Sequence, residues 1–304
     1  MRLFLSVDVE EWFQVENLKG AVARASWPKR ESRVEATTDW LLATLAETGT
    51  KATFFVLGWV AERSPELVRR IHAEGHEIAS HGYGHDLIYT LSPQAFREDL
   101  RRSKGILEEL TGEPVLGYRA PSFSITDWAV DVLGELDFKY DSSLFLAAAH
   151  DRYGRLATTA IKEAPYFRLP NGLCQVPLSY LSVMDKKIPW AGGGYFRVFP
   201  YPIFKWGVKR ILQTYGAYTF YIHPWEFDPD QPRIRNIRWS YRFRHYQNLS
   251  HTKTRFRDMV STFRFEPIRN LVPECALQPP QAVLTPPTAP PRKGQPGTGV
   301  RDAS

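Results

Sequence analysis

Short apolar runs alternate with amphipathic stretches over the first half of the chain. The amphipathic stretches repeat their apolar positions with the period of a helix, which predicts helices at Ser32–Gly49, Pro65–Gly75, Ser92–Gly112 and Asp127–Leu136. The runs between them predict short buried strands at Arg2–Asp8, Lys51–Leu57, His76–Ser80, Val115–Arg119 and Phe138–Asp141. This alternation indicates an α/β fold of parallel strands joined by right-handed crossovers, in a barrel or an open sheet.

Two of the predicted helices have recognisable starts. Ser32 is followed three residues later by Glu35, which is the spacing of a capping box. Ser92 precedes Pro93, a pairing that suits the N-cap and the first helical position.

The second half of the chain is less regular after about Thr158. It predicts a β-rich run at Glu163–Val176, a glycine loop at Gly192–Gly194 and a helix at Tyr201–Gly216. A strand at Tyr218–Ile222, one long basic helix at Arg242–Phe263 and a short strand at Arg264–Pro267 follow. From Pro273 onward, proline pairs with Ala, Thr and Gly replace the periodic pattern, so a disordered tail is expected over residues 273–304.

Composition allows one large core or two smaller ones. The chain has 304 residues, of which 43% are hydrophobic and 24% charged, so it is not a disordered protein. Much of the net charge of +6 lies between Arg233 and Arg257, a cluster that suits either a solvated surface or a phosphate or acidic polymer. We expect no nucleic acid partner, because a solvated surface is the commoner outcome for such a run.

The cysteines and the apolar runs bear on location. Cys174 and Cys275 lie far apart in sequence, so neither a disulfide framework nor a cysteine-type zinc site can be read. No apolar run approaches the roughly 20 residues that span a bilayer, and Asp8 ends the N-terminal run before a signal peptide would form. A soluble cytoplasmic protein with no membrane span is the expectation.

Candidate chemistry follows the predicted strands. His81 and His85 stand four positions apart and can point at one ion, which suits a catalytic metal that also binds water. Asp8 and Glu10 face the same side of an extended strand, where one can bind the metal and the other act as general base. Glu11 is the competing ligand, because a bend after the strand changes which acid faces inward.

Three further residues have both functional and ordinary structural explanations. Arg119 either orients a catalytic carboxylate or forms a surface ion pair. Pro121 fixes the chain so that the N–H of Ser122 can be aimed at an oxyanion. His223 follows an apolar strand, where it either acts as a general acid or is a structural histidine. In a parallel β/α barrel the active site lies at the C-terminal ends of the strands, where Asp8, His81, Arg119 and Asp141 are expected.

Five motifs in order resemble those of NodB-type polysaccharide deacetylases, carbohydrate esterase family 4, over roughly residues 1–226. They are Ser6-Val7-Asp8-Val9-Glu10, His81-Gly82-Tyr83-Gly84-His85, Arg119-Ala120-Pro121-Ser122, Tyr140-Asp141-Ser142-Ser143 and Ile222-His223-Pro224. Gly192–Tyr201, His223–Asp230 and Arg242–Tyr246 resemble a narrower branch, associated with exosortase/PEP-CTERM exopolysaccharide loci, which has its own C-terminal extension.

The resemblance implies a distorted (β/α)7 TIM-like barrel over residues 1–272, with the extension starting at about residue 227. It implies a hydrolase that removes acetyl from N-acetylhexosamine units of a bacterial polysaccharide in exopolysaccharide biosynthesis. By match to the motifs, Glu10, His81 and His85 bind a divalent metal, most often zinc, with cobalt or manganese as alternatives. Asp8 is then the base that Arg119 orients, the Ser122 N–H binds the oxyanion, and His223 protonates the leaving amine.

The chain departs from the family pattern at two places. The family's usual Asp-Asp pair is replaced by Asp8-Val9-Glu10, which leaves the acidic ligand open between Glu10 and Glu11. The Asp-Trp pair that supports the acid histidine is replaced by Leu144-Phe145, so Asp141, Asp185 and Glu226 are candidates for that support, with Asp141 included among the catalytic residues.

Other functions on the same fold stay open at this point. They are an O-acetyl esterase, an amidase acting on a small amide, and a glycan-binding protein without catalysis. The sequence does not name the polysaccharide or the oligomeric state.

Overall fold

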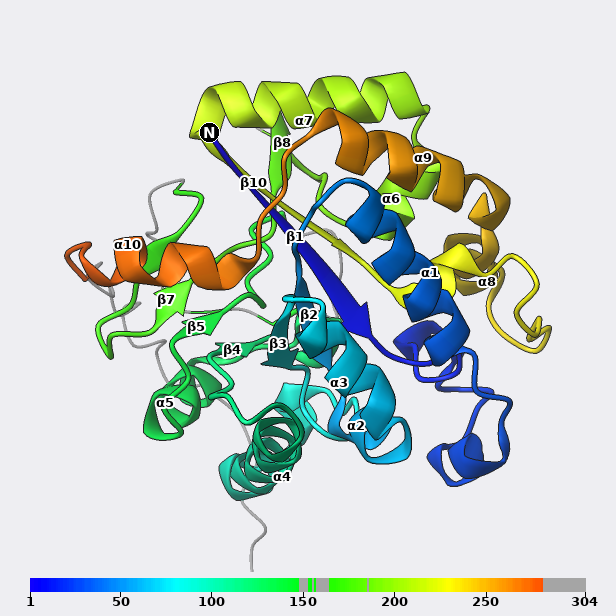
Figure 1. Cartoon of the computed structure of the whole chain (residues 1–304), viewed down its shortest axis with the longest axis horizontal. Helices are drawn as coiled ribbons and strands as arrows, with labels where there is room; N and C mark the ends of the chain where they lie inside the picture. The colour runs from blue at the N-terminus through cyan, green and yellow to red at the C-terminus, as the bar shows by residue number, and fades with distance from the viewer. Residues whose placement is uncertain (148–152, 155, 157–163, 185, 281–304) are drawn as a thin grey trace, which may run out of the picture.

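The structure, a computed structural model, describes residues 1–147, 153–154, 156, 164–184 and 186–280 (Figure 1). Its centre is an eight-stranded sheet in the order β10-β1-β2-β3-β4-β5-β7-β6. Every neighbouring pair is parallel except β6 with β7. The strands are β1 (Arg2–Val9), β2 (Thr53–Val56), β3 (Glu77–Ser80), β4 (Gly117–Tyr118), β5 (Tyr140–Asp141), β6 (Phe167–Arg168), β7 (Cys174–Gln175) and β10 (Ala217–Ile222).

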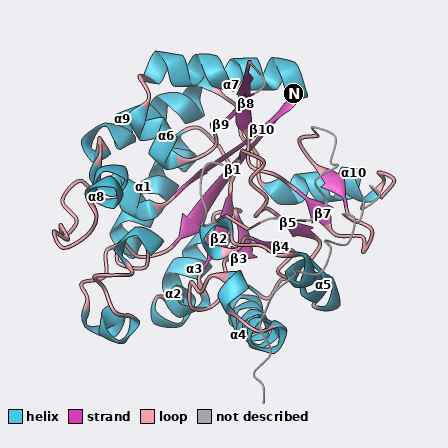
Figure 2. Cartoon of the chain, turned by 180° about the vertical axis from the view of Figure 1, so that it is seen from behind, coloured by secondary structure: helices cyan, strands magenta, loops and turns pink. Residues whose placement is uncertain are grey.

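Helices ring the outer side of this curled sheet (Figures 1 and 2). They are α1 (Val34–Glu47), α2 (Gly58–Arg63), α3 (Pro65–Ala73), α4 (Pro93–Thr111), α5 (Asp127–Glu135), α6 (Gly193–Val198), α7 (Tyr201–Tyr215), α8 (Trp239–Tyr246), α9 (Leu249–Thr262) and α10 (Val272–Ala276). A separate hairpin pairs β8 (Tyr180–Val183) with β9 (Lys186–Pro189). The prediction of a distorted parallel β/α barrel is confirmed, in the form of a curled half-barrel.

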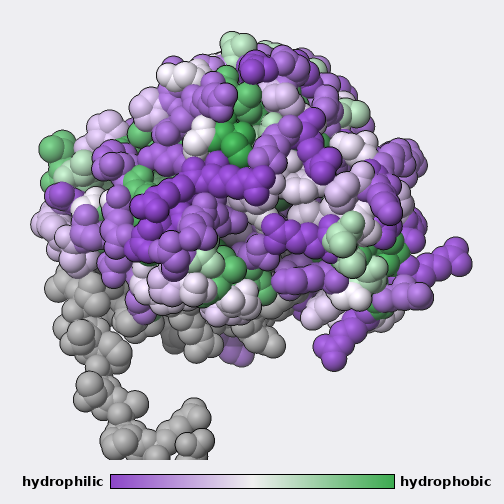
Figure 3. All heavy atoms as spheres, turned by 90° about the horizontal axis from the view of Figure 1, so that it is seen from below, coloured by the Kyte–Doolittle hydropathy of each residue, from purple (hydrophilic) through white to green (hydrophobic). Residues whose placement is uncertain are grey.

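The period of two along β1 decides which side chains reach the interior of the barrel. Leu5, Val7 and Val9 pack in the large apolar cluster under the helices. Phe4 belongs to a second cluster inside the barrel, and Ser6 and Asp8 follow it at the same spacing. All three are buried, as expected for a strand covered on both faces. On the face drawn in Figure 3, hydrophilic residues predominate and hydrophobic residues form small separate groups.

Two predictions about helices are wrong. The capping box at α1 does not form, since Ser32 and the N–H of Arg33 both donate to the carboxylate of Glu11 from another segment. The long helix predicted over Arg242–Phe263 is two helices, α8 and α9. Asn248 adopts a left-handed φ of 53° between them, which a continuous right-handed helix excludes.

The C-terminal region also differs from the prediction. Arg264–Pro267 contributes a single bridge, between Phe4 and Glu266, rather than a strand. Residues 272–276 form α10 instead of the start of a disordered tail, and residues from 281 onward lie outside the described part. Cys275 of α10 forms a disulfide with Cys174 of β7, across 101 residues of sequence. The fold brings together two cysteines whose spacing carried no signal.

Candidate active site

A cleft of about 450 Å³ opens at the C-terminal ends of the strands. The expected residues from four separate segments meet there: Asp8 and Glu10 from the end of β1, His81 and His85 after β3, Ser122 after β4, and His223 after β10. The parallel arrangement puts the ends of these strands at one edge of the sheet, which is why residues so far apart in sequence share one cavity.

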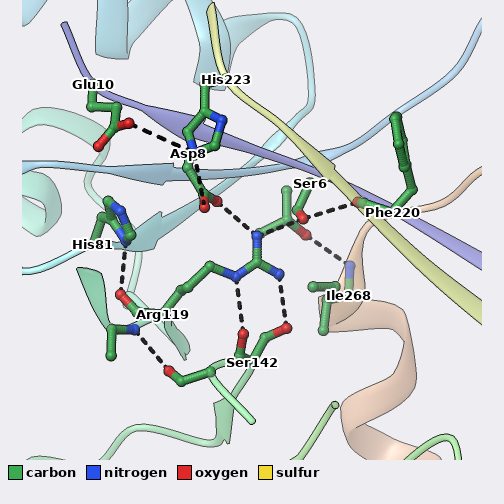
Figure 4. A network of polar contacts seen from close by, with 12 residues as sticks. Ser6, Asp8, Glu10, His81, Arg119, Ser142, Phe220, His223 and Ile268 are labelled. Carbon is green, nitrogen blue, oxygen red and sulfur yellow. Dashed lines mark hydrogen bonds and ion pairs between the residues drawn. The ribbon is translucent and has the colours of Figure 1, made fainter. Parts of the chain in front are cut away.

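Arg119 is buried and uses its guanidinium to hold Asp8 (Figure 4). Its Nη1 donates to Oδ1 of Asp8 and to Oγ of Ser6, at 2.7 Å each. Its Nε and Nη2 donate to the carbonyl and the hydroxyl of Ser142, at 3.0 and 2.8 Å. The side chain is therefore locked in one orientation, and Asp8 presents its other oxygen, Oδ2, to Nε2 of His223 at 3.9 Å.

Glu10, His81 and His85 offer three ligand atoms that lie within 4.8 Å of one another, and all three residues are buried. Nε2 of His85 lies 2.7 Å from Oε2 of Glu10, but the pair lacks the alignment of a hydrogen bond, so this oxygen accepts no hydrogen bond from a residue that the structure describes. Nδ1 of His81 donates to the carbonyl of Arg119 at 2.8 Å, which leaves its Nε2 free for a metal.

The local backbone explains how two histidines four residues apart reach one point. The segment after β3 is not helical: Gly82 has a φ of 74° and His85 a φ of 56°. A Cβ at Gly82 would press on the carboxylate of Asp99, which accepts the N–H of Tyr83 at 2.8 Å. The turn therefore needs glycine at this position.

The structure brings Glu10, and not Glu11, to the two histidines. The carboxylate of Glu11 accepts the Ser32 hydroxyl at 2.5 Å and the N–H of Arg33 at 3.1 and 3.2 Å. Glu11 is thus committed to the N-terminus of α1, where a negative charge is favoured. Glu10 instead accepts the indole N–H of Trp225 at 3.1 Å and faces the cleft.

His223 is supported by Glu226, one of the three acids that the sequence left open. Nδ1 of His223 lies 2.9 Å from Oε1 of Glu226, which also accepts the His223 N–H at 3.2 Å. On its other side, Glu226 accepts Nε of Arg197 at 2.7 Å. The ring of His223 stacks on Trp225 with ring centroids 5.1 Å apart, so the imidazole is fixed both at its edge and across its face.

Asp141 lies elsewhere. Its Oδ1 accepts the hydroxyl of Ser143 at 2.5 Å and its Oδ2 accepts the side chain of Gln175 at 2.7 Å. Ser143 in turn accepts the N–H of Ala120 at 2.7 Å. Asp141 therefore supports the segment that begins at Arg119, and it does not contact His223 in the part of the chain that the structure describes. The third candidate, Asp185, lies outside the described residues.

Ser122 and Phe123 both adopt left-handed backbone conformations, with φ of 50° and 57°. Such conformations are costly for residues other than glycine and gather at functional sites. Hydrogen bonds from the N–H of Phe123 to the carbonyl of Ala120 and from the N–H of Ser124 to that of Pro121 hold this turn. The N–H of Ser122 makes no hydrogen bond within the described residues, and Ser122 lines the cleft.

Burial and neighbouring charges shift the pKa values of Glu10 and His81 downward and that of His223 upward. Burial raises the pKa of Glu10, but His85, His223 and His81 outweigh burial and hold it at about 2. Burial lowers the pKa of His81 to about 4, so its ring is neutral, as metal ligation requires. Burial also lowers the pKa of His223, but Glu10, Glu226 and Asp8 outweigh burial and raise it to about 9. His223 therefore carries a proton at neutral pH.

The sequence missed Arg197, which is 1% exposed and belongs to α6. Its one signal is the preceding glycine run, since a Cβ at Gly193 would collide with the carboxylate of Glu226. The glycine thus lets the helix carrying Arg197 come close to Glu226. Trp225 was read only as part of a motif, although it contacts both Glu10 and His223.

Two family models match consecutive parts of the chain. Residues 29–140 match the polysaccharide deacetylase family, and residues 142–273 match a domain of unknown function, DUF3473. The site draws on both, since the histidine pair, Arg119 and Ser122 lie in the first range, and Arg197, His223 and Glu226 in the second. Asp8 and Glu10 precede both ranges.

Three curated relatives show the same likeness. A peptidoglycan deacetylase-like protein of Gibberella zeae is 36% identical over 130 residues, 38% of each chain. A peptidoglycan-N-acetylglucosamine deacetylase of Bacillus cereus is 32% identical over 108 residues, 31% of this chain and 39% of its own. A chitin deacetylase of Pestalotiopsis sp is 33% identical over 106 residues, which are 34% of this chain and 36% of its own. The matched part of the chain thus spans less than half of each relative.

Solved structures share the fold over nearly the whole chain. A candidate polysaccharide deacetylase from Mycobacterium smegmatis has a TM-score of 0.62 at 21% identity, covering 95% of this chain and 94% of its own. Puue allantoinase has a TM-score of 0.59 at 15% identity, covering 92% of both. At such identities the likeness establishes the fold alone. The family models show that the chain contains a region similar to the polysaccharide deacetylase family over residues 29–140 and a DUF3473 region over residues 142–273.

Proposed function

We propose that this chain is a metal-dependent deacetylase that hydrolyses the N-acetyl group of N-acetylhexosamine units in a bacterial polysaccharide, in exopolysaccharide biosynthesis. The observation that carries the proposal is the arrangement of the cleft. The buried triad of Glu10, His81 and His85 stands beside an Asp8 held by Arg119, and Nε2 of His223 lies 3.6 Å from Oε1 of Glu10. The deacetylase relatives support the reaction class.

The triad fits a divalent metal on the evidence of its own atoms. Oε2 of Glu10 is buried and has no hydrogen-bond donor among the described residues, and two imidazole nitrogens lie within reach of it. Two histidines and a carboxylate are a common catalytic shell for zinc. When bound, the cation supplies Lewis-acid polarisation of the acetyl carbonyl.

Asp8 is placed to act as the general base. Arg119 occupies Oδ1, so Oδ2 is the oxygen that faces the cleft and removes a proton from the attacking water. The water oxygen bonds to the carbonyl carbon, and negative charge develops on the carbonyl oxygen. The N–H of Ser122, which has no other acceptor among the described residues, is available to that oxyanion.

His223 supplies the proton that completes the reaction. Breaking the C–N bond releases the sugar amine, which needs a proton to leave, and the acetyl group departs as acetate. Glu226 holds Nδ1 of His223, so Nε2 points into the cleft as the donating atom.

We further propose that the two matched regions work as one domain, from residue 1 through α10. β1, which precedes both matched ranges, pairs with β2 of the first range on one side and with β10 of the DUF3473 region on the other, so strands of both ranges belong to one sheet.

The test is acetate release from N-acetylglucosamine oligomers by the purified, metal-loaded chain, with mass spectrometry of the sugar product. Loss of one acetyl mass per event is expected, and a chelator should abolish it. His81→Ala should lose both bound metal and activity, whereas His251→Ala, an exposed histidine on α9, should lose neither. Full activity in His81→Ala, or acetate release only from O-acetylated sugars, would contradict the proposal.

A further inference from the structure

A second hollow of about 490 Å³ lies along α8, and we call it the α8 groove. Four of its lining residues share one face of α8, at the spacing i, i+3, i+4 and i+7. They are Trp239, Arg242, Phe243 and Tyr246, and Arg233 and Arg235 line it from the preceding loop.

The loop and the helix are tied together, so the groove is a formed feature of the surface. The hydroxyl of Tyr246 accepts the N–H of Ile234 at 2.8 Å and donates to the carbonyl of Pro232 at 3.2 Å. The guanidinium of Arg233 lies over the Tyr246 ring, 5.3 Å from its centroid. Below the groove, Arg197 binds the last carbonyls of α8, which holds the helix on the catalytic site.

Two aromatic rings of the groove, those of Trp239 and Phe243, are exposed to solvent. Trp239 is 75% exposed and Phe243 is 40% exposed. Their rings stack with centroids 5.6 Å apart and an interplanar angle of 24°. Their flat faces are open to a ligand, and such faces suit the C–H faces of pyranose sugars.

The groove is also positively charged. Arg233, Arg235 and Arg242 are exposed, and none of the three has an ion pair with a described residue. No carboxylate is among the described residues that line the groove. Guanidinium groups bind carboxylates through two parallel hydrogen bonds, so the lining favours a ligand with carboxylate groups.

The groove continues into the catalytic cleft. Phe243 lines both, and its neighbour Arg244 lines the cleft. Glu16 also lines the cleft, and its carboxylate has Lys19 as an ion-pair partner at 3.5 Å. A linear polymer with one unit beside Glu10 and His223 therefore meets the α8 groove with the units that follow.

We infer that the α8 groove binds the flanking units of an acidic, uronate-bearing N-acetylated polysaccharide while one N-acetylhexosamine unit occupies the cleft. This inference rests on the proposed function and specifies its substrate class. The aromatic pair stacks on the sugars, and the three arginines bind the uronate carboxylates. The positive charge of the groove would also attract a nucleic acid, but a groove continuous with the proposed deacetylation site favours a glycan.

The test compares two hexasaccharides on the metal-loaded full chain: an alternating N-acetylglucosamine–glucuronate oligomer and a neutral N-acetylglucosamine oligomer. The acidic hexamer should have the lower KM per acetyl group, and added salt should remove this advantage, because exposed ion pairs are screened. Arg235→Gln/Arg242→Gln should raise the KM for the acidic hexamer by roughly 2- to 30-fold, several times more than for the neutral one. Trp239→Ala should raise the KM for both.

The matched control is Lys209→Gln/Arg210→Gln, which removes two exposed charges from α7, away from the cleft and the groove. It should leave both KM values unchanged. Circular dichroism melting curves should show that the four proteins are equally folded.

Two results would overturn the inference while leaving deacetylation intact. One is an equal KM for both hexamers at low salt, and the other is an equal response of both to the arginine variant. If neither hexamer loses acetate, the proposed function fails, and calorimetric titration with the acidic hexamer decides on the groove. Salt-sensitive binding that the arginine variant weakens supports it; no binding, or tighter binding of a thymidine oligonucleotide of equal charge, overturns it.

Discussion

Nε of Arg197 lies 2.7 Å from Oε2 of Glu226, and each side chain is only 1% exposed. This buried pair links helix α8 to His223, because Arg197 also donates to the carbonyls of Arg244 and His245, and Glu226 contacts His223. Arg197 and His223 both lower the pKa of Glu226 against the opposing effect of burial. Glu226 thus stays ionised and holds Nδ1 of His223.

Arg197→Met should lower the free energy of unfolding by about 3–5 kcal/mol, because it leaves the Glu226 charge buried and unpaired. The double variant Arg197→Met/Glu226→Gln should be more stable than Arg197→Met alone, since it removes that charge. Arg257→Met, which loses an exposed ion pair with Glu47, should cost about 1 kcal/mol or less. Urea denaturation gives all three values, and a double variant no more stable than the single one would contradict the explanation.

His223→Ala should reduce kcat on an N-acetylglucosamine oligomer by about 10²–10⁴-fold, the usual contribution of a general acid. Metal content, measured by elemental analysis, should stay that of the wild type, because His223 is not among the three clustered ligand residues. An unchanged kcat would remove His223 from this role, and a loss of metal would indicate that it is a ligand.

Arg119→Lys should lower kcat strongly, although both side chains are positively charged. Arg119 donates four hydrogen bonds, to Ser6, Asp8 and both oxygens of Ser142, and one ammonium cannot reproduce them. Misplacing Asp8 should lower kcat by about 100-fold. Arg102→Lys, at an exposed pair with Glu62, is the control and should be near neutral. Equal kcat values for the two variants would argue against an orienting role for Arg119.

Asp141 should make stability depend on pH. Burial raises its pKa to about 7, against smaller opposing effects of Ser143 and Arg119. Below pH 3.8 the carboxyl is protonated in both the folded and the unfolded state, and its stabilising contribution is complete; it is lost as pH rises to about 7. The unfolding free energy of the wild type minus that of Asp141→Asn should therefore fall across this window, by at most about 1.4 kcal/mol per pH unit. A difference independent of pH would show that Asp141 titrates normally.

Reduction should destabilise the protein through the disulfide between Cys174 and Cys275. The bond closes a loop of 101 residues, so reduction, or Cys174→Ser/Cys275→Ser, should cost about 2–5 kcal/mol. Denaturation with and without dithiothreitol measures this cost, and the double variant should not respond to the reductant. Disulfides persist mainly in oxidising compartments, so this bond weighs against the expected cytoplasmic location. No helix in the described part of the chain is long and apolar enough to cross a membrane.

Local patterns predicted the strands and helices well where a short sequence decides them. β1, β2, β3, α3, α5 and α7 begin or end within a few residues of the predicted positions. Ser92 caps α4 through the N–H of Ala95, as its position before proline predicts. Such signals depend on neighbours in sequence, and therefore they can be read without the fold.

Features that depend on distant contacts could not be read. Glu10 and Glu11 are adjacent acids, and only the position of α1 commits Glu11 to the backbone of Arg33. Ser32 and Glu35 had the spacing of a capping box, yet each found a partner elsewhere, Ser32 in Glu11 and Glu35 in the hydroxyl of Ser64. The capping box does not form because both side chains make hydrogen bonds with residues from other segments of the chain.

The sequence by itself determined the alternation of strands and helices and which acids, histidines and arginine stand at strand ends. Parallel strands then bring those ends to one edge. Only the tertiary structure decided that Glu10 joins the histidines, that Glu226 and Arg197 support His223, that α8 and α9 separate, and that Cys174 meets Cys275. Each of these depends on contacts between residues far apart in the chain, which no local spacing encodes.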